Sequence, residues 1–280
     1  MSAPQLPVGV SQVAGPDGFP CLRVETPLCG ALVSLYGAQL LSFTPAGHTH
    51  LLWLSPKAVF AEGTAIRGGV PVCAPWFGPG VAGPLSPSHG PCRLSTWELA
   101  DADSDGGAVA LVFALETGGF AYRYRLGLSH ALTLELSITA LDEAVPPLAE
   151  AALHTYLRVG DVSQVSVSGL ASATAEDKTG KGLTSLSEDG LLPIPAHTDA
   201  VFSTGDAART VHDPVLGRSI TLTSQGAGST IVWNPYQDGP DLSEWQKMLC
   251  LESGSVTSSA WPVRKGETKT IRARYEVRAF

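Results

Sequence analysis

Residues 131–141 read ALTLELSITAL, a stretch in which apolar and polar residues alternate. The apolar positions are Leu132, Leu134, Leu136 and Ile138, and the positions between them are Thr133, Glu135, Ser137 and Thr139. Successive side chains of a β-strand point to opposite faces, so this pattern predicts a strand with one face in a core and the other in water.

The C-terminal segment TKTIRARYEVRAF, residues 268–280, repeats the pattern. One predicted face carries Ile271, Ala273, Tyr275, Val277 and Ala279, and the other carries Arg272, Arg274, Glu276 and Arg278. Many shorter apolar segments, among them LLWL and STIVWNP, are bounded by Gly, Pro, Asp or Ser. A dozen or more strands at this spacing predict an all-β fold of packed antiparallel sheets.

Helices have little room in a chain with 30 Gly and 21 Pro. Short helical pieces are predicted only around residues 56–61 and 241–247. The stretch ASATAEDKTGKGLTSLSEDG, residues 171–190, is rich in small and polar residues and is interpreted as an exposed excursion between core strands. Because 280 residues with 44% hydrophobic content suffice for one core, we expect a single domain over residues 1–280.

Composition also narrows the classes of partner. The net charge of −8 gives no basic field for nucleic acid. No run of about 18 apolar residues predicts a membrane span, and the N-terminal residues lack the pattern of a signal peptide. We therefore expect a cytoplasmic protein that binds neither nucleic acid nor membranes. Its five cysteines contain no CxxC pair, so we expect free, mostly buried thiols and no metal site.

Two loops combine positive charge with glycine. In AIRGGVP, Arg67 precedes Gly68 and Gly69, and glycine lets a guanidinium group and nearby backbone N–H groups approach an anion. The alternative is a turn whose arginine forms a surface ion pair. In SHGPCRLSTWEL, His89 and Arg93 share one loop, which suits an anionic or hydroxyl-rich ligand, although a histidine in a loop can equally be structural.

Two strands carry candidate proton-transfer groups. In AALHTYLRVGD, His154 alternates with leucines and shares a polar, aromatic face with Tyr156, as a sugar-binding surface or a structural histidine would. In KMLCLESGSV, Glu252 follows an apolar strand and is interpreted as its end. A carboxyl group there is either partly desolvated, which raises its pKa toward the range useful for proton transfer, or points into water.

These segments, taken in order, resemble the glucose-6-phosphate 1-epimerases of the aldose 1-epimerase superfamily. The matching blocks are IRGGVPVCAPWFG, SHGPCRLSTWEL, ALHTYLRVGD, HTDAVF, TIVWNPY and MLCLESGSV. The resemblance implies a galactose-mutarotase-like β-supersandwich of antiparallel sheets. It also implies that His154 and Glu252 are catalytic, that Arg67 and Arg93 hold a phosphorylated sugar, and that Asp199 binds it.

The loop before Arg93 departs from the family pattern. His89 is assigned to the pocket by its place beside the family's glycine, and Ser88 stands where the family has a longer glutamine. Pro91 and Cys92 replace the residues of a family HGFAR motif. These departures predict a reshaped loop, and they leave open which sugar is preferred.

The resemblance implies interconversion of the α and β anomers of a hexose 6-phosphate, most simply glucose 6-phosphate. Glu252 would act as base and His154 as acid, and the reaction requires no cofactor. We expect a small-molecule hexose phosphate as partner and a monomeric protein. The alternatives are an aldose 1-epimerase for unphosphorylated hexoses and a non-catalytic carbohydrate-binding protein of the same fold.

Overall fold

The computed structural model describes residues 4–143, 148–237 and 244–280, and strands dominate all three ranges. The paired strands run antiparallel throughout these ranges, as the alternating patterns predict. Helical residues in this described part form only short 3-10 turns: η1 (Pro16–Gly18), η2 (Cys92–Leu94), η3 (Val162–Gln164), η4 (Trp245–Lys247) and η5 (Thr257–Ser259). None of the helices described is long and apolar enough to cross a membrane.

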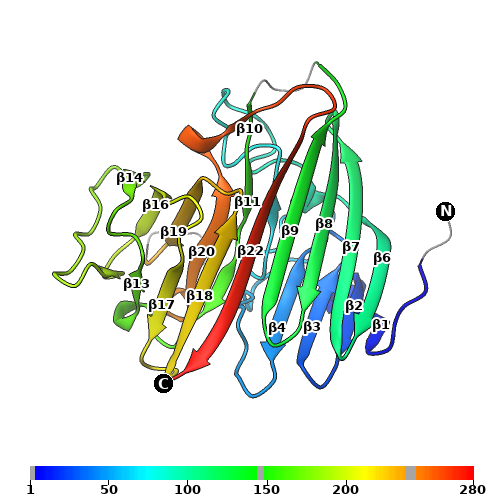
Figure 1. Ribbon diagram of the computed structural model, residues 1–280, viewed down its shortest axis with the longest axis horizontal. Coiled ribbons are helices and arrows are strands. Elements are labelled where there is room, and N and C mark those ends of the chain that lie inside the picture. The colour runs from blue at the N-terminus through cyan, green and yellow to red at the C-terminus, as the bar shows by residue number, and fades with distance from the viewer. Residues whose placement is uncertain (1–3, 144–147, 238–243) are drawn as a thin grey trace.

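The largest sheet has nine strands and spans the front of Figure 1. In spatial order they are β15 (Leu192–Pro193), β13 (Ser166–Ser168), β17 (Arg209–Asp213), β18 (Arg218–Gln225), β22 (Thr268–Ala279), β9 (Leu132–Ala140), β8 (Phe120–Leu128), β7 (Ala108–Thr117) and β6 (Glu98–Asp105). The two segments with the clearest alternation, β9 and β22, are neighbours near its centre.

A seven-stranded sheet lies behind the nine-stranded one. Its strands are β14 (Thr174–Asp177), β16 (Thr198–Ser203), β19 (Ser229–Asn234), β20 (Met248–Ser255), β11 (Ala151–Leu153) and β5 (Val72–Cys73) in order, with β12 (Tyr156–Arg158) also paired to β20. Two smaller sheets complete the fold: β1 (Val10–Ala14), β2 (Pro20–Glu25), β3 (Cys29–Ser34) and β4 (Leu40–Pro45), and the pair β10 (Leu148–Ala149) with β21 (Trp261–Pro262).

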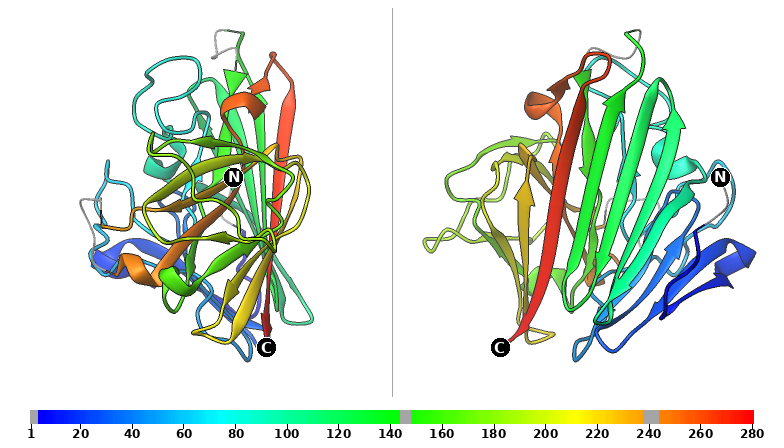
Figure 2. Two further views of the ribbon diagram at one scale, coloured as in Figure 1. Left: turned by 90° about the vertical axis from the view of Figure 1, so that its left-hand side faces the viewer. Right: turned by 45° about the vertical axis from the view of Figure 1, so that its right-hand side comes forward.

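The main core lies between the two large sheets. Strand β22 packs on β20, where the Tyr275 hydroxyl donates a hydrogen bond of 2.7 Å to the Leu251 carbonyl oxygen. In Figure 2, the red strand β22 runs along the outer layer, and the orange strand β20 lies on its inner side. Leu249 and Leu251 join this core, so period-two alternation turns Cys250 and Glu252 to the opposite face of β20. That opposite face forms the floor of the pocket described below.

The alternation predicted for residues 131–141 and 268–280 is confirmed, except at the end of β22. The four apolar residues of β9 are at most 1% exposed, and so are Ile271, Ala273 and Tyr275 of β22. Val277 is only partly buried and Ala279 is exposed. The reason is that β22 runs beyond its neighbour β9, whose pairing ends at Tyr275, so the last residues have less core to cover.

Three local predictions are wrong or incomplete. Residues 56–61 form a turn and irregular chain, because the Ser55 hydroxyl accepts the Lys57 backbone N–H at 3.1 Å and caps a turn that is not continued as a helix. Of residues 241–247, the first three lie outside the described residues and the last three form η4. The 171–190 stretch is not only an excursion, because residues 174–177 form β14 at the edge of the seven-stranded sheet.

The predicted strand end at Glu252 is also wrong. Strand β20 continues to Ser255, and Ser253 and Gly254 pair with β19. Polar and small residues there resembled a turn, but in this sheet they are buried between layers. A side chain at Gly254 would meet the Ala151 carbonyl oxygen at 2.8 Å, so close strand packing explains the glycine. All five cysteines are free and buried, as expected.

Candidate active site

A pocket of about 680 Å³ lies on the face of the seven-stranded sheet opposite the main core. Its volume is within the range typical of small-molecule sites. All seven residues singled out from the sequence line this one pocket: Arg67, Ser88, His89, Arg93, His154, Asp199 and Glu252. The fold therefore brings together residues that are far apart in the chain: Arg67 and Glu252 are separated by 185 positions.

Strand register explains how the sheet assembles the pocket floor. Tyr156, Cys250, Trp233 and Asp199 form one row across β12, β20, β19 and β16. The adjacent row on the same face contains Glu252, Ile231, Val201 and Glu176. Residues two apart on a strand share a face, so both rows lie on the pocket side of the sheet, and all their members except Cys250 and Val201 line the pocket.

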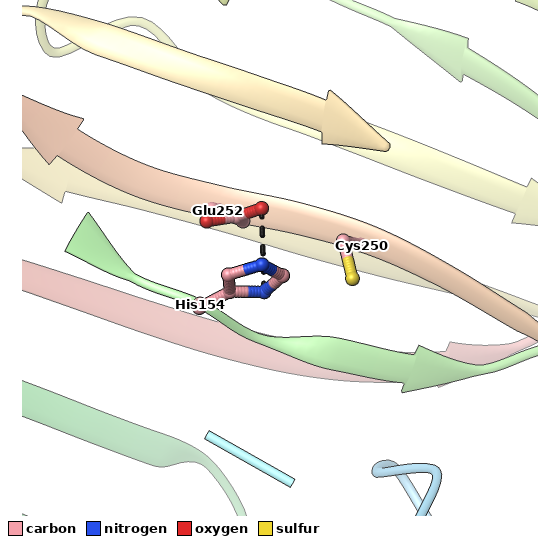
Figure 3. A group of neighbouring side chains, drawn as sticks. All are labelled: His154, Cys250 and Glu252. Carbon is pink, nitrogen blue, oxygen red and sulfur yellow. Dashed lines mark ion pairs between the residues drawn. The ribbon is translucent and has the colours of Figure 1, made fainter. Parts of the chain in front are cut away.

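His154 and Glu252 face each other across β11 and β20 (Figure 3). Nδ1 of His154 lies 3.4 Å from Oε1 of Glu252, and their side chains are 10% and 0% exposed. Within the described residues, neither Nδ1 nor either carboxyl oxygen of Glu252 has a hydrogen-bond partner. Buried polar groups without partners are costly, so these atoms are suited to a polar ligand that completes their hydrogen bonding.

Burial shifts the proton affinities of this pair in opposite directions. Burial, and to a smaller degree the charge of Asp199, raises the pKa of the Glu252 carboxyl group well above its usual range. Burial lowers the pKa of the His154 imidazole well below its usual range, and electrostatic interactions with His89 and with the Arg93 charge act in the same direction. Both shifts favour the neutral forms, because a low-dielectric site penalises charge.

The His154 ring is held by its neighbours. It stacks on the Tyr156 ring with centroids 4.7 Å apart and an interplanar angle of 9°. The rings of His89 and Trp233 approach it edge-on at 5.7 and 6.1 Å. Its backbone N–H donates to the Pro71 carbonyl oxygen at 3.0 Å, which extends the pairing of β11 with β5 by one residue. The imidazole orientation is therefore set by packing on several sides.

Arg67 reaches the pocket, but its two glycines have a different role from the one expected. The Arg67 guanidinium carbon lies 5.9 Å above the centre of the Trp233 ring. The Gly69 N–H is already used, because it donates to the Trp53 carbonyl oxygen at 2.7 Å. A Cβ on Gly69 would collide with the Leu40 carbonyl oxygen, and its φ is +62°. The glycines thus permit close backbone packing and leave the guanidinium group to face a ligand.

The loop of residues 88–93 carries a second arginine. Arg93 lies in η2 and donates through Nη2 to the Ser88 carbonyl oxygen at 3.0 Å, so the Ser88 backbone orients it. The Arg93 Nε is buried and has no partner among the described residues. Cys92, one of the departures from the family pattern, is fully buried in the core and so anchors the loop.

His89 is a neutral group in this loop. Its Nδ1 accepts the Gly78 backbone N–H at 3.2 Å, which leaves Nε2 as the hydrogen-bearing nitrogen. Burial, followed by the charge of Arg93, lowers the pKa of His89 to about 3. His89 can therefore donate a hydrogen bond from Nε2 at neutral pH without carrying a charge.

Several pocket residues were missed in the sequence. Glu150 is buried, and its carboxyl group accepts backbone N–H groups of Phe77, Val81 and Thr257 at 3.2, 2.9 and 2.8 Å, which ties the 77–81 loop to η5. Glu176 and Lys178 line the pocket from the β14 side. Alternation within TAEDK could have placed these two on one face, but the surrounding Gly and Ser residues favoured a loop.

His154, Cys250 and Glu252 have donor atoms that bind metals, and these atoms lie within 4.8 Å of one another (Figure 3). A metal would require the Cys250 thiolate, whereas burial raises the pKa of that thiol well above its usual value. Arg67 and Arg93 line the same pocket and would repel a dication. The residues fit a metal poorly, and the pocket's charges suit an anionic or hydroxyl-rich ligand better.

Relatives with curated names match most of the chain. A Salmonella typhimurium protein named "Putative glucose-6-phosphate 1-epimerase" is 35% identical over 275 residues, covering 91% of this chain and 89% of the relative. An Escherichia coli protein with the same name is 38% identical over 234 residues, covering 81% and 77%.

Solved structures agree with the fold. A crystal structure titled as a "putative mutarotase" from Salmonella typhimurium superposes with a TM-score of 0.86 at 29% identity, covering 99% of this chain and 96% of that one. A galactose mutarotase-like protein from Clostridium acetobutylicum superposes with a TM-score of 0.75 at 14% identity over 97% and 98%. The predicted galactose-mutarotase-like all-β fold is confirmed. Because residues 20–276 also match the family model "Aldose 1-epimerase", the chain belongs to the aldose 1-epimerase family, as its resemblance implied.

Proposed function

We propose that this protein interconverts the α and β anomers of a hexose 6-phosphate, with glucose 6-phosphate as the preferred substrate. The observation that carries the proposal is the buried His154 and Glu252 pair, unsatisfied and side by side, in a pocket that also holds Arg67 and Arg93. Family membership supports the reaction type, and the names of the relatives from Salmonella and Escherichia support the phosphorylated substrate.

In the proposed reaction, the Glu252 carboxylate removes the proton from the C1 hydroxyl. The bond between C1 and the ring oxygen breaks as the C1 carbonyl forms, and the ring oxygen takes a proton from the His154 imidazolium. Rotation about the C1–C2 bond of the open-chain aldehyde presents the other carbonyl face. The hydroxyl formed from the ring oxygen then attacks C1 and gives its proton back to His154, while Glu252 returns its proton to the C1 oxygen, which closes the ring as the opposite anomer.

Burial acts on this pair in two ways. In the empty pocket it favours the neutral forms, so the charged forms that react are the less populated ones. In those charged forms, the raised pKa makes the Glu252 carboxylate a stronger base, and the lowered pKa makes the His154 imidazolium a stronger acid. Each group changes its protonation state once in ring opening and once in ring closure, with the roles of acid and base exchanged. Such a pair suits a reaction that runs both ways through the same intermediate.

The proposed phosphate site consists of Arg67 and Arg93. Guanidinium groups bind phosphate through paired N–H donors, and the buried, unpartnered Nε of Arg93 offers one such donor. A protein of net charge −8 repels a sugar phosphate at long range, so this attraction has to be local. In the proposal, Asp199 accepts a sugar hydroxyl, and Ser88 and His89 bound the loop side of the pocket.

The test is magnetisation-transfer NMR of α-to-β exchange, with glucose 6-phosphate, glucose and galactose as parallel substrates. We expect acceleration of the phosphate ester above that of the free sugars. Arg93→Ala should raise KM for glucose 6-phosphate by about 10- to 100-fold, as expected for loss of a charged hydrogen bond, and change free glucose little. Arg123→Ala, on the exposed face of β8, is the matched control.

Either alternative would be recognised by its pattern. Acceleration of free sugars alone would assign an aldose 1-epimerase for unphosphorylated hexoses. Binding of sugars without acceleration of any of them would assign a non-catalytic carbohydrate-binding protein.

A further inference from the structure

The edge strand β14 supplies a part of the pocket that the proposed catalytic and phosphate-binding groups do not use. Glu176 and Lys178 both line the pocket, and their side chains form an ion pair of 2.7 Å between Oε1 and Nζ. Residues two apart on a strand share a face, so the two side chains point in the same direction. Asp177 between them turns to the other face.

Lys178 has a well-defined backbone position. Its N–H donates to the Asp199 carbonyl oxygen at 2.8 Å, which extends the β14–β16 pairing by one residue. The Asp177 carboxylate accepts the backbone N–H groups of Thr179 and Gly182 at 2.9 and 2.8 Å and so holds the following turn. These hydrogen bonds hold the backbone of Lys178 in place, at the end of the row that contains Asp199 and Trp233.

The β14 end of the pocket lies away from the proposed reacting atoms. Glu176 and Glu252 occupy the same row with Val201 and Ile231 between them. Three strand spacings separate them, about 14 Å between backbones. A sugar with C1 at Glu252 and its ring over Ile231 would direct its remote hydroxyls toward Asp199, Lys178 and Glu176.

Local charge decides what this end can bind. Two carboxyl groups, Glu176 and Asp199, surround one ammonium group, so the balance does not favour a phosphate. The arginines lie elsewhere in the pocket, with Arg67 over Trp233 and Arg93 bonded to the Ser88 loop. A carboxylate that accepts beside an ammonium group that donates matches two neighbouring hydroxyl groups of a sugar.

The ion pair itself can yield to such a ligand. The Lys178 and Glu176 side chains are 37% and 50% exposed, and ion pairs at such exposure contribute little to stability. Exchanging part of this contact for sugar hydroxyls therefore costs little, whereas each new charge-assisted hydrogen bond strengthens binding.

We propose that Glu176 and Lys178 form a hydroxyl-binding subsite that determines which hexose configuration the pocket prefers. The inference rests on the proposed function, and it names the side of the sugar that this function leaves unassigned. Lys178 donates to a ring hydroxyl remote from C1, and Glu176 accepts from its neighbour.

The experiment measures dissociation constants by NMR titration, which does not depend on turnover. The probes are glucose 6-phosphate, mannose 6-phosphate and galactose 6-phosphate, which differ at C2 or C4, together with free glucose. The variants are Lys178→Met, Lys178→Arg and Glu176→Ala. Lys269→Met is the matched control, because Lys269 forms a similar pair of 3.0 Å with Glu267 two residues away on the segment leading into β22, outside the pocket.

We expect Lys178→Met to weaken binding of glucose 6-phosphate and of free glucose alike, by about 10-fold, and to change the preference among the three phosphates by at least about 5-fold. Lys178→Arg should restore part of the affinity, and Glu176→Ala should shift the same preference. The control should match the unchanged protein. Exposed substitutions of this kind change stability little, so melting temperatures should stay close together.

Two results would overturn the subsite. In one, Lys178→Met binds every probe as the unchanged protein does. In the other, it loses affinity for the phosphates but not for free glucose, which would make Lys178 a phosphate ligand. Failure of the proposed function has a different signature, namely binding without faster anomer exchange in the unchanged protein, and the titrations still decide the subsite in that case.

Discussion

Strands β9 and β20 lie in facing sheets and treat their polar residues in opposite ways. In β9, Glu135 alternates with buried leucines and meets water and Arg272 at 3.9 Å. In β20, all eight residues are buried, and Glu252 is 0% exposed without a hydrogen-bond partner among the described residues. Strand β9 follows the rule that polar side chains face water, whereas β20 breaks it at the proposed reacting pair. The exception is informative, because buried polar groups are nearly always hydrogen-bonded, and a polar ligand in the pocket would supply the missing partners.

The contrast between β9 and β20 predicts its largest difference when the glutamate of each strand is replaced by glutamine. Glu252→Gln should lower the rate of anomer exchange by about 10² to 10⁴, the usual contribution of general acid–base catalysis. Glu135→Gln on β9 is the matched control and should leave the rate unchanged. Magnetisation-transfer NMR on glucose 6-phosphate measures both. Normal exchange by Glu252→Gln would remove Glu252 from the proposed mechanism.

A core substitution in β9 should lower stability and leave substrate affinity unchanged. Leu134→Ala removes a fully buried side chain from the interface between the sheets and should destabilise the protein by about 2–5 kcal/mol. Because Leu134 is remote from the pocket lining, KM should stay close to its original value. Urea unfolding and exchange kinetics on the same sample test this. A loss of substrate affinity at unchanged stability would mean that β9 contributes to substrate binding, which contradicts the contrast drawn between β9 and β20.

Glu252→Gln should also make the folded protein more stable at neutral pH. Burial raises the folded-state pKa of Glu252, so its contribution to stability is fully present below the unfolded value near 4.5 and is lost as pH rises toward the folded value. Glutamine does not ionise and carries no such loss. The difference in melting temperature between the variant and the original should therefore grow from pH 4.5 to pH 7. A difference that is constant with pH would contradict the burial argument.

A smaller effect is expected at His89. Its pKa of about 3 lies below the unfolded value near 6.5, so the unfolded chain binds the proton first and stability falls as pH drops between these two values. His89→Asn should flatten part of that fall, measured as melting temperature against pH. His130→Asn, at an exposed position in the connection between β8 and β9, serves as the comparison. An unchanged profile for both variants would indicate that His89 titrates normally.

The sequence predicted much of this architecture, and the reasons differ by region. Alternation identified β9 and β22 because each has one face toward the core and one toward water. It misjudged β20 beyond Glu252, since a strand buried on both faces does not need to alternate. Arg67, His154 and Glu252 were found through ordered motifs, whereas Glu150 was missed because its role depends on three backbone N–H groups from distant loops.

Strand β14, at the edge of the seven-stranded sheet, was also not predictable from its local sequence. Residues 174–178 are polar and surrounded by Gly and Ser, so their sequence resembles a loop, and only pairing with β16 makes them a strand. That pairing brings Lys178 beside Asp199, a contact between residues 21 positions apart that no local pattern specifies.

By itself, the sequence determined the all-β class, the strands that alternate and the residue types of the proposed chemistry, because these follow from local periodicity and side-chain chemistry. Only the tertiary structure decided that Glu252 faces His154, that both are dehydrated, and that Glu176 and Lys178 share their pocket. The physical reason is that register and burial arise from long-range pairing and packing of sheets. Those interactions set both the distances between side chains and the local dielectric on which their pKa values depend.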